Sequence, residues 1–467
     1  MDTRFEARLV ETMRCNRLLA VASLPLWLAV PLVAAAAEQF KLALPTPQSA
    51  VENVELHFAV SGTAEFALEK GQALAHPISA QATLKYRERA LPGAGRDAQA
   101  LRALRHYDSI DAKIRVADHE TTPQLADDRR LLVAEGRREG ILFYSPQGPL
   151  TALQLELLRA PGDSLSLLGL LPPKPVTVGE KWSPPSWVGQ MLTDTEAAAK
   201  SDLSCTLEAV DDGQAKVKFE GTVEGATAGS STKISLHGSY VFDVKAQRLA
   251  QAEFEQTEER SVGPISPGLK VTAKAVVLRT PASDTSDLTP EAAAAIPLEP
   301  PAALLQLYFR TPWNVKFRHD RDWHVFQQSE QIAVLRLMDQ GAFVAQCNLA
   351  PVRQANPGEH VPDDQFQKDI RTSLGTRLKA IEKAEILLTD DQRFLYRVTA
   401  NGEANKIPTT WIYYLCAAPN GLQTSFVFAV ETALRDKLGK RDLEMINSLR
   451  FLDQSKPPTL AVPPGKG

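Results

Sequence analysis

Cysteine is scarce in this sequence, and its few cysteines form no familiar spacing. The chain has four cysteines in 467 residues, too few for a disulfide scaffold. No CxxC pair occurs, so neither a redox motif nor a zinc site is indicated. Cys347 and Cys416 lie on expected strands in the same part of the chain. We take them as the candidates for one disulfide, with two free thiols as the alternative.

Catalytic signatures are also missing. The sequence contains no GxSxG elbow, no HExxH, no P-loop and no GxGxxG, and its eight histidines are dispersed. We therefore expect no catalytic residue, no metal ligand and no cofactor. An enzyme, such as a hydrolase whose site is assembled from scattered residues, stays open as an alternative.

Neither sign of charge dominates. The formal net charge is −4, and lysine and arginine are spread along the chain. A nucleic-acid partner is not expected, because such proteins concentrate positive charge on one surface.

The only long apolar run lies near the start of the sequence. Arg14 and Arg17 precede the apolar residues 18–33, and the small residues 34–37 follow. This order is typical of a secretory signal, and we predict cleavage after Ala37. Met1 and Met13 both stay open as the start. We expect an exported protein, periplasmic or extracellular, with no transmembrane segment after cleavage.

Period-two alternation predicts a first, β-rich domain over residues 38–280. Val54, Leu56 and Val60 share one face of an expected strand, and several later segments repeat the pattern. Residues 211–213, Asp-Asp-Gly, are a turn signal between two long strands. Strands of this length predict a curved antiparallel sheet or a partial barrel with a few helices.

A second domain is expected over residues 302–454. Residues 281–301 are rich in proline and alanine and predict a linker, and residues 455–467 predict a disordered tail. We expect helices over 185–199 in the first domain, and over 363–378 and 433–449 in the second. Asn-Gly at 401–402 and at 420–421 predicts hairpin turns. The expected fold class is therefore α+β, with the second domain a sheet packed by helices.

Several aromatic side chains suit either a core or a binding surface. They are Trp182, Trp313, Trp323, Trp411 and Tyr413. Packing against a sheet is the default for such residues. A shared binding surface is the functional alternative.

The second domain resembles the PsbP/DcrB-like fold of exported α+β proteins. The resemblance rests on Trp313, Phe317 and Trp323, on the helix and strands that follow, and on the closing residues 446–451. It implies a non-enzymatic accessory or binding role. The first domain resembles uncharacterised exported bacterial proteins through residues 148–151, 170–172 with 178–182, and 238–243. Its expected meander is loosely similar to the half-barrel carriers of the Lol system.

These observations favour an exported, non-enzymatic envelope protein that binds a ligand or serves as an accessory subunit. The expected partner is an unknown envelope protein or an apolar small molecule. A structural, protein-interacting component of the envelope is the alternative from another class.

Overall fold

The computed structural model describes residues 38–45, 50–67, 73–93 and 97–452. The predicted signal segment and the predicted tail from residue 455 lie outside these residues. Residue 38 falls in a separate unit from residues 39 onward, which form one compact unit.

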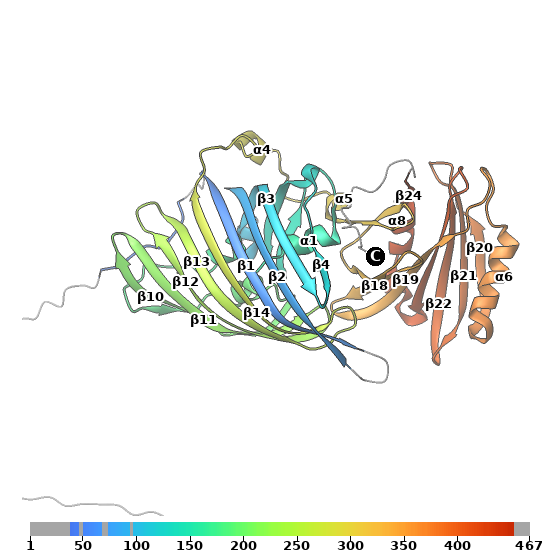
Figure 1. The fold of residues 1–467 in the computed structure, drawn as a ribbon, viewed down its shortest axis with the longest axis horizontal. Helices are drawn as coiled ribbons and strands as arrows, with labels where there is room; N and C mark the ends of the chain where they lie inside the picture. Colours follow the sequence, from blue (N-terminus) through green and yellow to red (C-terminus); the bar gives the residue numbers. More distant parts are fainter. Residues whose placement is uncertain (1–37, 46–49, 68–72, 94–96, 453–467) are drawn as a thin grey trace, which may run out of the picture. The chain divides into compact units, whose positions relative to one another are not determined.

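A large antiparallel sheet dominates the first part of the chain (Figure 1). Its strands run in the order β6-β5-β3-β2-β1-β14-β13-β12-β11-β10-β8, with β4 beside β3 and β9 beside β11. The strands are β1 (Val51–Ala67), β2 (Ala73–Ala90), β3 (Arg102–Val116), β4 (His119–Thr121), β5 (Leu131–Arg137), β6 (Gly140–Tyr144), β8 (Lys181–Trp182), β9 (Ala197–Ser201), β10 (Ser204–Asp211), β11 (Gln214–Thr227), β12 (Ser230–Asp243), β13 (Arg248–Arg260) and β14 (Gly268–Pro281).

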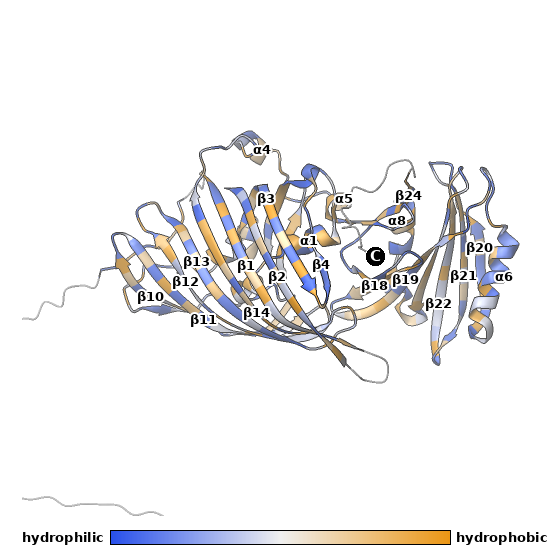
Figure 2. Cartoon of the chain, viewed as in Figure 1, coloured by the Kyte–Doolittle hydropathy of each residue, from blue (hydrophilic) through white to orange (hydrophobic). Residues whose placement is uncertain are grey.

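Alternation along these strands decides which face is buried. Val54 and Leu56 of β1 point to one face of the sheet and are buried. Asn53 points to the opposite face and is exposed. Figure 2 shows the same exchange of hydrophilic and hydrophobic residues along the long strands. The predicted turn at 211–213 is confirmed: Asp212 and Gly213 have φ of 50° and 81°, which suits a two-residue hairpin.

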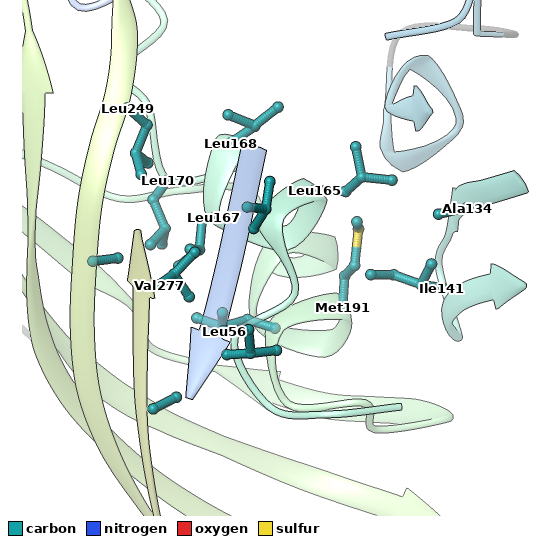
Figure 3. Packing of buried hydrophobic residues seen from close by; sticks show 14 of the residues in the cluster. Leu56, Ala134, Ile141, Leu165, Leu167, Leu168, Leu170, Met191, Leu249 and Val277 are labelled. Atoms are coloured by element: carbon teal, nitrogen blue, oxygen red, sulfur yellow. The ribbon is translucent and has the colours of Figure 1, made fainter. Parts of the chain in front are cut away.

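Three short helices cover the apolar, concave face of this sheet. They are α1 (Ala152–Leu158), α2 (Ser164–Leu168) and α3 (Ser186–Leu192). Their leucines share one hydrophobic core with the strands. Figure 3 shows Leu165, Leu167 and Leu168 of α2 among side chains of β1, β13 and β14.

Two further sheets follow. A seven-stranded sheet has the order β17-β18-β19-β23-β22-β21-β20, and a four-stranded sheet has the order β24-β16-β15-β7. The strands are β7 (Leu150–Thr151), β15 (Leu307–Arg310), β16 (Val315–His319), β17 (Trp323–Gln328), β18 (Ala333–Asp339), β19 (Ala342–Val352), β20 (Leu378–Ile386), β21 (Phe394–Ala404), β22 (Ile407–Ala417), β23 (Gln423–Glu431) and β24 (Arg450–Phe451). The remaining helices are α4 (Pro290–Ala294), α5 (Ala302–Leu305), α6 (Asp363–Leu374), α7 (Arg435–Leu438) and α8 (Arg441–Asn447).

The predicted fold class, α+β, is wrong, because the chain is mostly β. More than half of the described residues lie in strands, and the longest helix among them, α6, has 12 residues. The helices predicted over 185–199 and 363–378 end early, at Leu192 and Leu374. The helix predicted over 433–449 is divided between α7 and α8 at Gly439, whose φ is 60°. Glycine adopts a positive φ at little energetic cost, so the helix ends at Gly439 although the apolar pattern continues beyond it.

One of the two predicted Asn-Gly turns is displaced. Asn420-Gly421 does join β22 to β23. Asn401-Gly402, however, lies inside β21, and the hairpin turns at Asn405-Lys406, whose φ values are 51° and 67°. Gly402 instead allows the backbone of Arg377 to approach β21 closely, since a Cβ at residue 402 would overlap that backbone.

The segment predicted as a linker, 281–301, contains α4 and contacts the large sheet. Leu288 is fully buried, in a cluster with Val51 and Leu104. Asp284 and Asp287 both form ion pairs with Arg87 of β2, at 3.1 and 2.7 Å.

Candidate functional site

The five predicted aromatic residues do not form one surface. Trp182 packs against the core of the large sheet, and its indole nitrogen donates to the carbonyl oxygen of Leu170 at 3.0 Å. Trp313 and Trp323 belong to the main core of the seven-stranded sheet. Trp411 and Tyr413 are buried in a third cluster, beneath α6. The structure therefore places all five in hydrophobic packing.

The candidate disulfide between Cys347 and Cys416 is not formed. Both thiols are free and buried. Cys347 of β19 lies opposite Phe428 of β23, and Cys416 of β22 lies opposite Thr424 of β23. The two cysteines are thus separated by a whole strand, which places them beyond bridging distance. Burial raises the pKa of Cys416 to about 12, as expected for an unreactive thiol.

Charged side chains interrupt the apolar face of the large sheet at one end. Glu52 continues the face of Val54 and Leu56 on β1, and Glu88 continues the face of Tyr86 on β2. Arg105 of β3 lies opposite Glu88, and Arg279 of β14 lies opposite Val54. These four side chains consequently point toward the concave side, where charge is costly unless it is paired.

Arg105 is the centre of this group and is fully buried. Its Nε donates to Glu88 Oε2 at 2.8 Å, and its Nη1 and Nη2 donate to the two carboxylate oxygens of Asp163 at 2.6 and 2.8 Å. Ser164 accepts from Nη2 at 2.9 Å and donates to Glu88 at 2.6 Å. The planar guanidinium thus joins two strands to the start of α2.

Glu88 is shared by two cations. Arg279 Nη2 lies 3.3 Å from Glu88 Oε1 and also pairs with Glu52. Burial alone would raise the pKa of Glu88, but the charges of Arg105 and Arg279 outweigh it and hold that pKa below its usual value. The carboxylate therefore stays ionised inside the fold.

A first cavity, of about 500 Å³, lies beside this charged group. Its size is within the range of about 300–1,000 Å³ that is usual for small-molecule sites. Its walls are mainly aliphatic and its charged groups sit together. Its lining includes five leucines and five charged residues: Leu44, Leu91, Leu101, Leu165, Leu168, Glu52, Glu88, Arg102, Arg248 and Arg279.

A second cavity, of about 480 Å³, lies at the other end of the same strands. Arg248, the first residue of β13, lines the first cavity, and Arg260, the last, lines the second. The second cavity is more polar. Its charged lining includes Glu156, Arg159, Asp194, Glu196, Glu258 and Arg260.

Helix α2 separates the two cavities. Leu165 and Leu168 line the first, whereas Asp163, which caps the helix, and Ser166 line the second. Arg105 holds this short helix in place through Asp163. The concave face is thus closed across its middle and open toward each end.

Asp194 is the most perturbed carboxylate of the second cavity. Protein surrounds it, and this desolvation raises its pKa to about 6. Its side chain is nevertheless 44% exposed, as fits a residue that lines a cavity. Arg159, 3.9 Å away, lowers the pKa, but not enough to cancel the desolvation.

We expect Asp194→Asn to stabilise the protein at neutral pH. A carboxyl whose folded pKa is raised takes up protons on folding, so its stability contribution falls as pH rises from about 4 to about 6. Because the side chain is partly exposed, the gain at pH 7 should be about 1 kcal/mol or less. Asparagine also tolerates the φ of 52° at this position.

Urea unfolding at pH 3.5 and pH 7 checks this prediction. The variant and the parent should be alike at pH 3.5 and differ at pH 7. Asp202→Asn, on an exposed carboxylate paired with Lys200, is the control and should not change this pH dependence. A parent stability that rises between pH 4 and pH 6 through Asp194 would contradict the assignment.

Period-two alternation by itself indicates that some charged side chains point toward the buried face of the sheet. Glu88 has the parity of Leu84 and Tyr86, and Glu52 has that of Val54. A charged residue at the end of an apolar face is nevertheless expected in solvent when its strand is considered alone. Their partners, Arg105 and Asp163, come from sequence positions that no spacing links to them.

Neither a cluster of metal ligands nor a helix suited to crossing a membrane occurs among the described residues. Among them, no group of three or more His, Cys, Asp or Glu side chains is placed to hold a metal ion. No helix in the described ranges is both long and apolar enough to cross a membrane.

Comparisons with known proteins identify no family. No family model matches the chain, and no curated protein matches it. A crystal structure from Bacteroides thetaiotaomicron VPI-5482 is similar over 32% of this chain, with 12% identity and a TM-score of 0.24, and the chain spans about half (49%) of that structure's length. A BenF-like porin from Pseudomonas fluorescens Pf-5 aligns over 81% of this chain and 97% of its own, at 6% identity and a TM-score of 0.11. Similarity this weak assigns neither a fold family nor a function.

Proposed function

We propose that this chain is an exported, non-enzymatic binding protein that holds an apolar small molecule in the first cavity. The observation that carries the proposal is the cavity itself. It lies between the sheet and α2, it has mainly aliphatic walls, and it has a hydrogen-bonded charged group on one side. An apolar ligand gains from leaving water for such walls, and a few fixed polar groups orient it.

The proposed location is the periplasm or the extracellular space. Support comes from the sequence, in which Arg14 and Arg17, the apolar residues 18–33 and the small residues 34–37 follow the order of a secretory signal. An accessory role of the PsbP/DcrB-like type for the second part of the chain belongs to the same proposal.

A protein-interacting envelope component is the second candidate function. Leu388 is fully exposed and Ile386 is 58% exposed, at the end of the edge strand β20. Edge strands with apolar ends offer both hydrogen bonds and hydrophobic contact to a partner chain. Co-purification of one defined envelope protein, lost in Leu388→Asp, would favour this function.

Native mass spectrometry of the processed chain, from Glu38 onward, tests the binding function. The protein is purified from its own cell envelope and then extracted with organic solvent. We expect a discrete additional mass that the extraction removes. An unliganded mass from several gentle purifications would contradict a tightly held ligand.

Filling the first cavity should abolish binding. Ala90 lines it at the end of β2, and in Ala90→Trp the indole would occupy the space of the ligand. We expect the additional mass to be lost while the variant stays folded. Ala59→Trp, on the exposed opposite face of β1, is the matched control and should keep the ligand. Retention of the ligand in Ala90→Trp would place it elsewhere.

A further inference from the structure

We infer that the ligand of the first cavity is a single-chain amphiphile with one anionic group, bound through Arg248. This inference rests on the proposed binding function and specifies the chemical class of the ligand. It follows from how the charged residues of the cavity are paired.

The charged lining consists of three arginines, Arg102, Arg248 and Arg279, and two glutamates, Glu52 and Glu88. Because Arg102 pairs with Glu135, which does not line the cavity, the other two arginines and the two glutamates are equal in number. Which arginine is left for a ligand therefore depends on how these groups are paired. A charge on the wall of a mainly apolar space is stable when it is paired.

Both glutamates are already occupied. Glu52 accepts from Arg279 Nε at 2.6 Å. Glu88 accepts from Arg105, Ser164 and Arg279. Neither carboxylate is left to attract a cationic ligand, so the preference of the cavity is set by its arginines.

Arg102 is held by the fold, although its Nε is buried without a hydrogen-bond partner. Its guanidinium lies 3.5 Å from Glu135, and its Nη2 donates to the hydroxyl of Tyr144 at 2.9 Å. A second bond from Nη2 goes to the backbone carbonyl of Pro297. This arginine is thus held by three partners of the fold.

Arg248 is different, because it forms no salt bridge in the described part of the chain. Asp243, its cross-strand neighbour on β12, interacts with its charge but does not line the cavity. Arg248 Nη1 donates to the backbone carbonyl oxygen of Arg279 at 2.5 Å, which fixes the side chain against β14. In addition, Nη1 of Arg279 is buried without a hydrogen-bond partner. Both arginines line the cavity and retain guanidinium donors that an anionic group of a ligand can satisfy.

The apolar part of the lining favours a ligand that contains a hydrocarbon chain. Leu44, Leu91, Leu101, Leu165 and Leu168 border the same space. A small inorganic anion would pair with Arg248, but the leucine side chains of the cavity would remain exposed to water. A neutral hydrocarbon would cover the walls but leave the cation unpaired. A long-chain carboxylate satisfies both.

Calorimetric titration of the delipidated, processed protein with dodecanoate and with dodecan-1-ol tests the inference. The two probes share a chain and differ in the charge. We expect dodecanoate to bind at least about tenfold more tightly, which corresponds to about 1.4 kcal/mol. Arg248→Gln should remove this preference, and Arg248→Lys should keep part of it. Arg115→Gln, an exposed arginine paired with Glu120 on the outer face, is the control and should behave like the parent.

The outcomes separate the inference from the function on which it rests. Equal affinity of the parent for the two probes would overturn the anionic group and leave the binding function standing, and this comparison needs no variant. A preference that persists in folded Arg248→Gln would overturn the role of Arg248. Failure of both probes, together with an unliganded native mass, would contradict the binding function itself.

Discussion

Replacing Arg105 by methionine is expected to lower the free energy of unfolding by about 3–5 kcal/mol. The substitution leaves Asp163 without its cation and Glu88 with Arg279 only, and both carboxylates are largely buried. A buried carboxylate without a partner is among the costliest defects in a folded protein. The cation–π contacts of Arg105 with Tyr86 and Phe143, at 4.8 and 5.6 Å, are lost as well.

Hydrogen exchange followed by mass spectrometry measures this effect where it arises. Peptides from β2, β3 and α2 should lose protection, whereas β21 and β22 should not change. The double variant Arg105→Met/Asp163→Asn is the informative comparison. Asparagine is neutral and can still cap α2, so the double variant should recover much of the loss. A single variant as stable as the parent would show that the ion pairs are not a buried network.

Leu167→Ala is expected to cost about 2–5 kcal/mol. Leu167 is fully buried on α2, within the core that divides the two cavities. Removing its side chain loses the transfer free energy of the leucine and leaves a void next to existing empty space. We expect the neighbouring side chains to fill this void only in part, so the loss of unfolding free energy should lie in the upper part of this range.

Urea unfolding and the same exchange peptides check the Leu167 prediction. Leu153→Ala on α1, 52% exposed, removes the same atoms where little is buried. It should change stability by less than about 0.5 kcal/mol. A similar cost for the two variants would mean that α2 does not seal the concave face.

The candidate site was only partly accessible to prediction. A large antiparallel sheet followed from long alternating strands such as β1 and β2. Core packing is the default expectation for the aromatic candidates, and Trp323, Trp411 and Tyr413 are buried. Trp182 and Trp313 are half-buried against the cores. Arg248 carried no local signal, since an arginine at the start of a strand is ordinarily solvated.

The sequence by itself determined the β-rich character of residues 51–281 and the faces of their strands. Alternation does this because successive side chains point to opposite faces and only one face is buried. It also determined the turn at 211–213, where the backbone preferences of the residues act locally. Its helix predictions failed at Gly439 because apolar spacing does not record where the backbone reverses.

Only the tertiary structure decided how the inward charges are used. Glu88, Arg105 and Asp163 come from β2, β3 and the start of α2, and their 2.6–2.8 Å contacts exist only once those segments pack. Likewise, Cys347 and Cys416 occupy one sheet but are kept apart by β23 between them. Pairing between distant segments depends on strand order and register, and these are set by the packing of the whole sheet rather than by any local pattern.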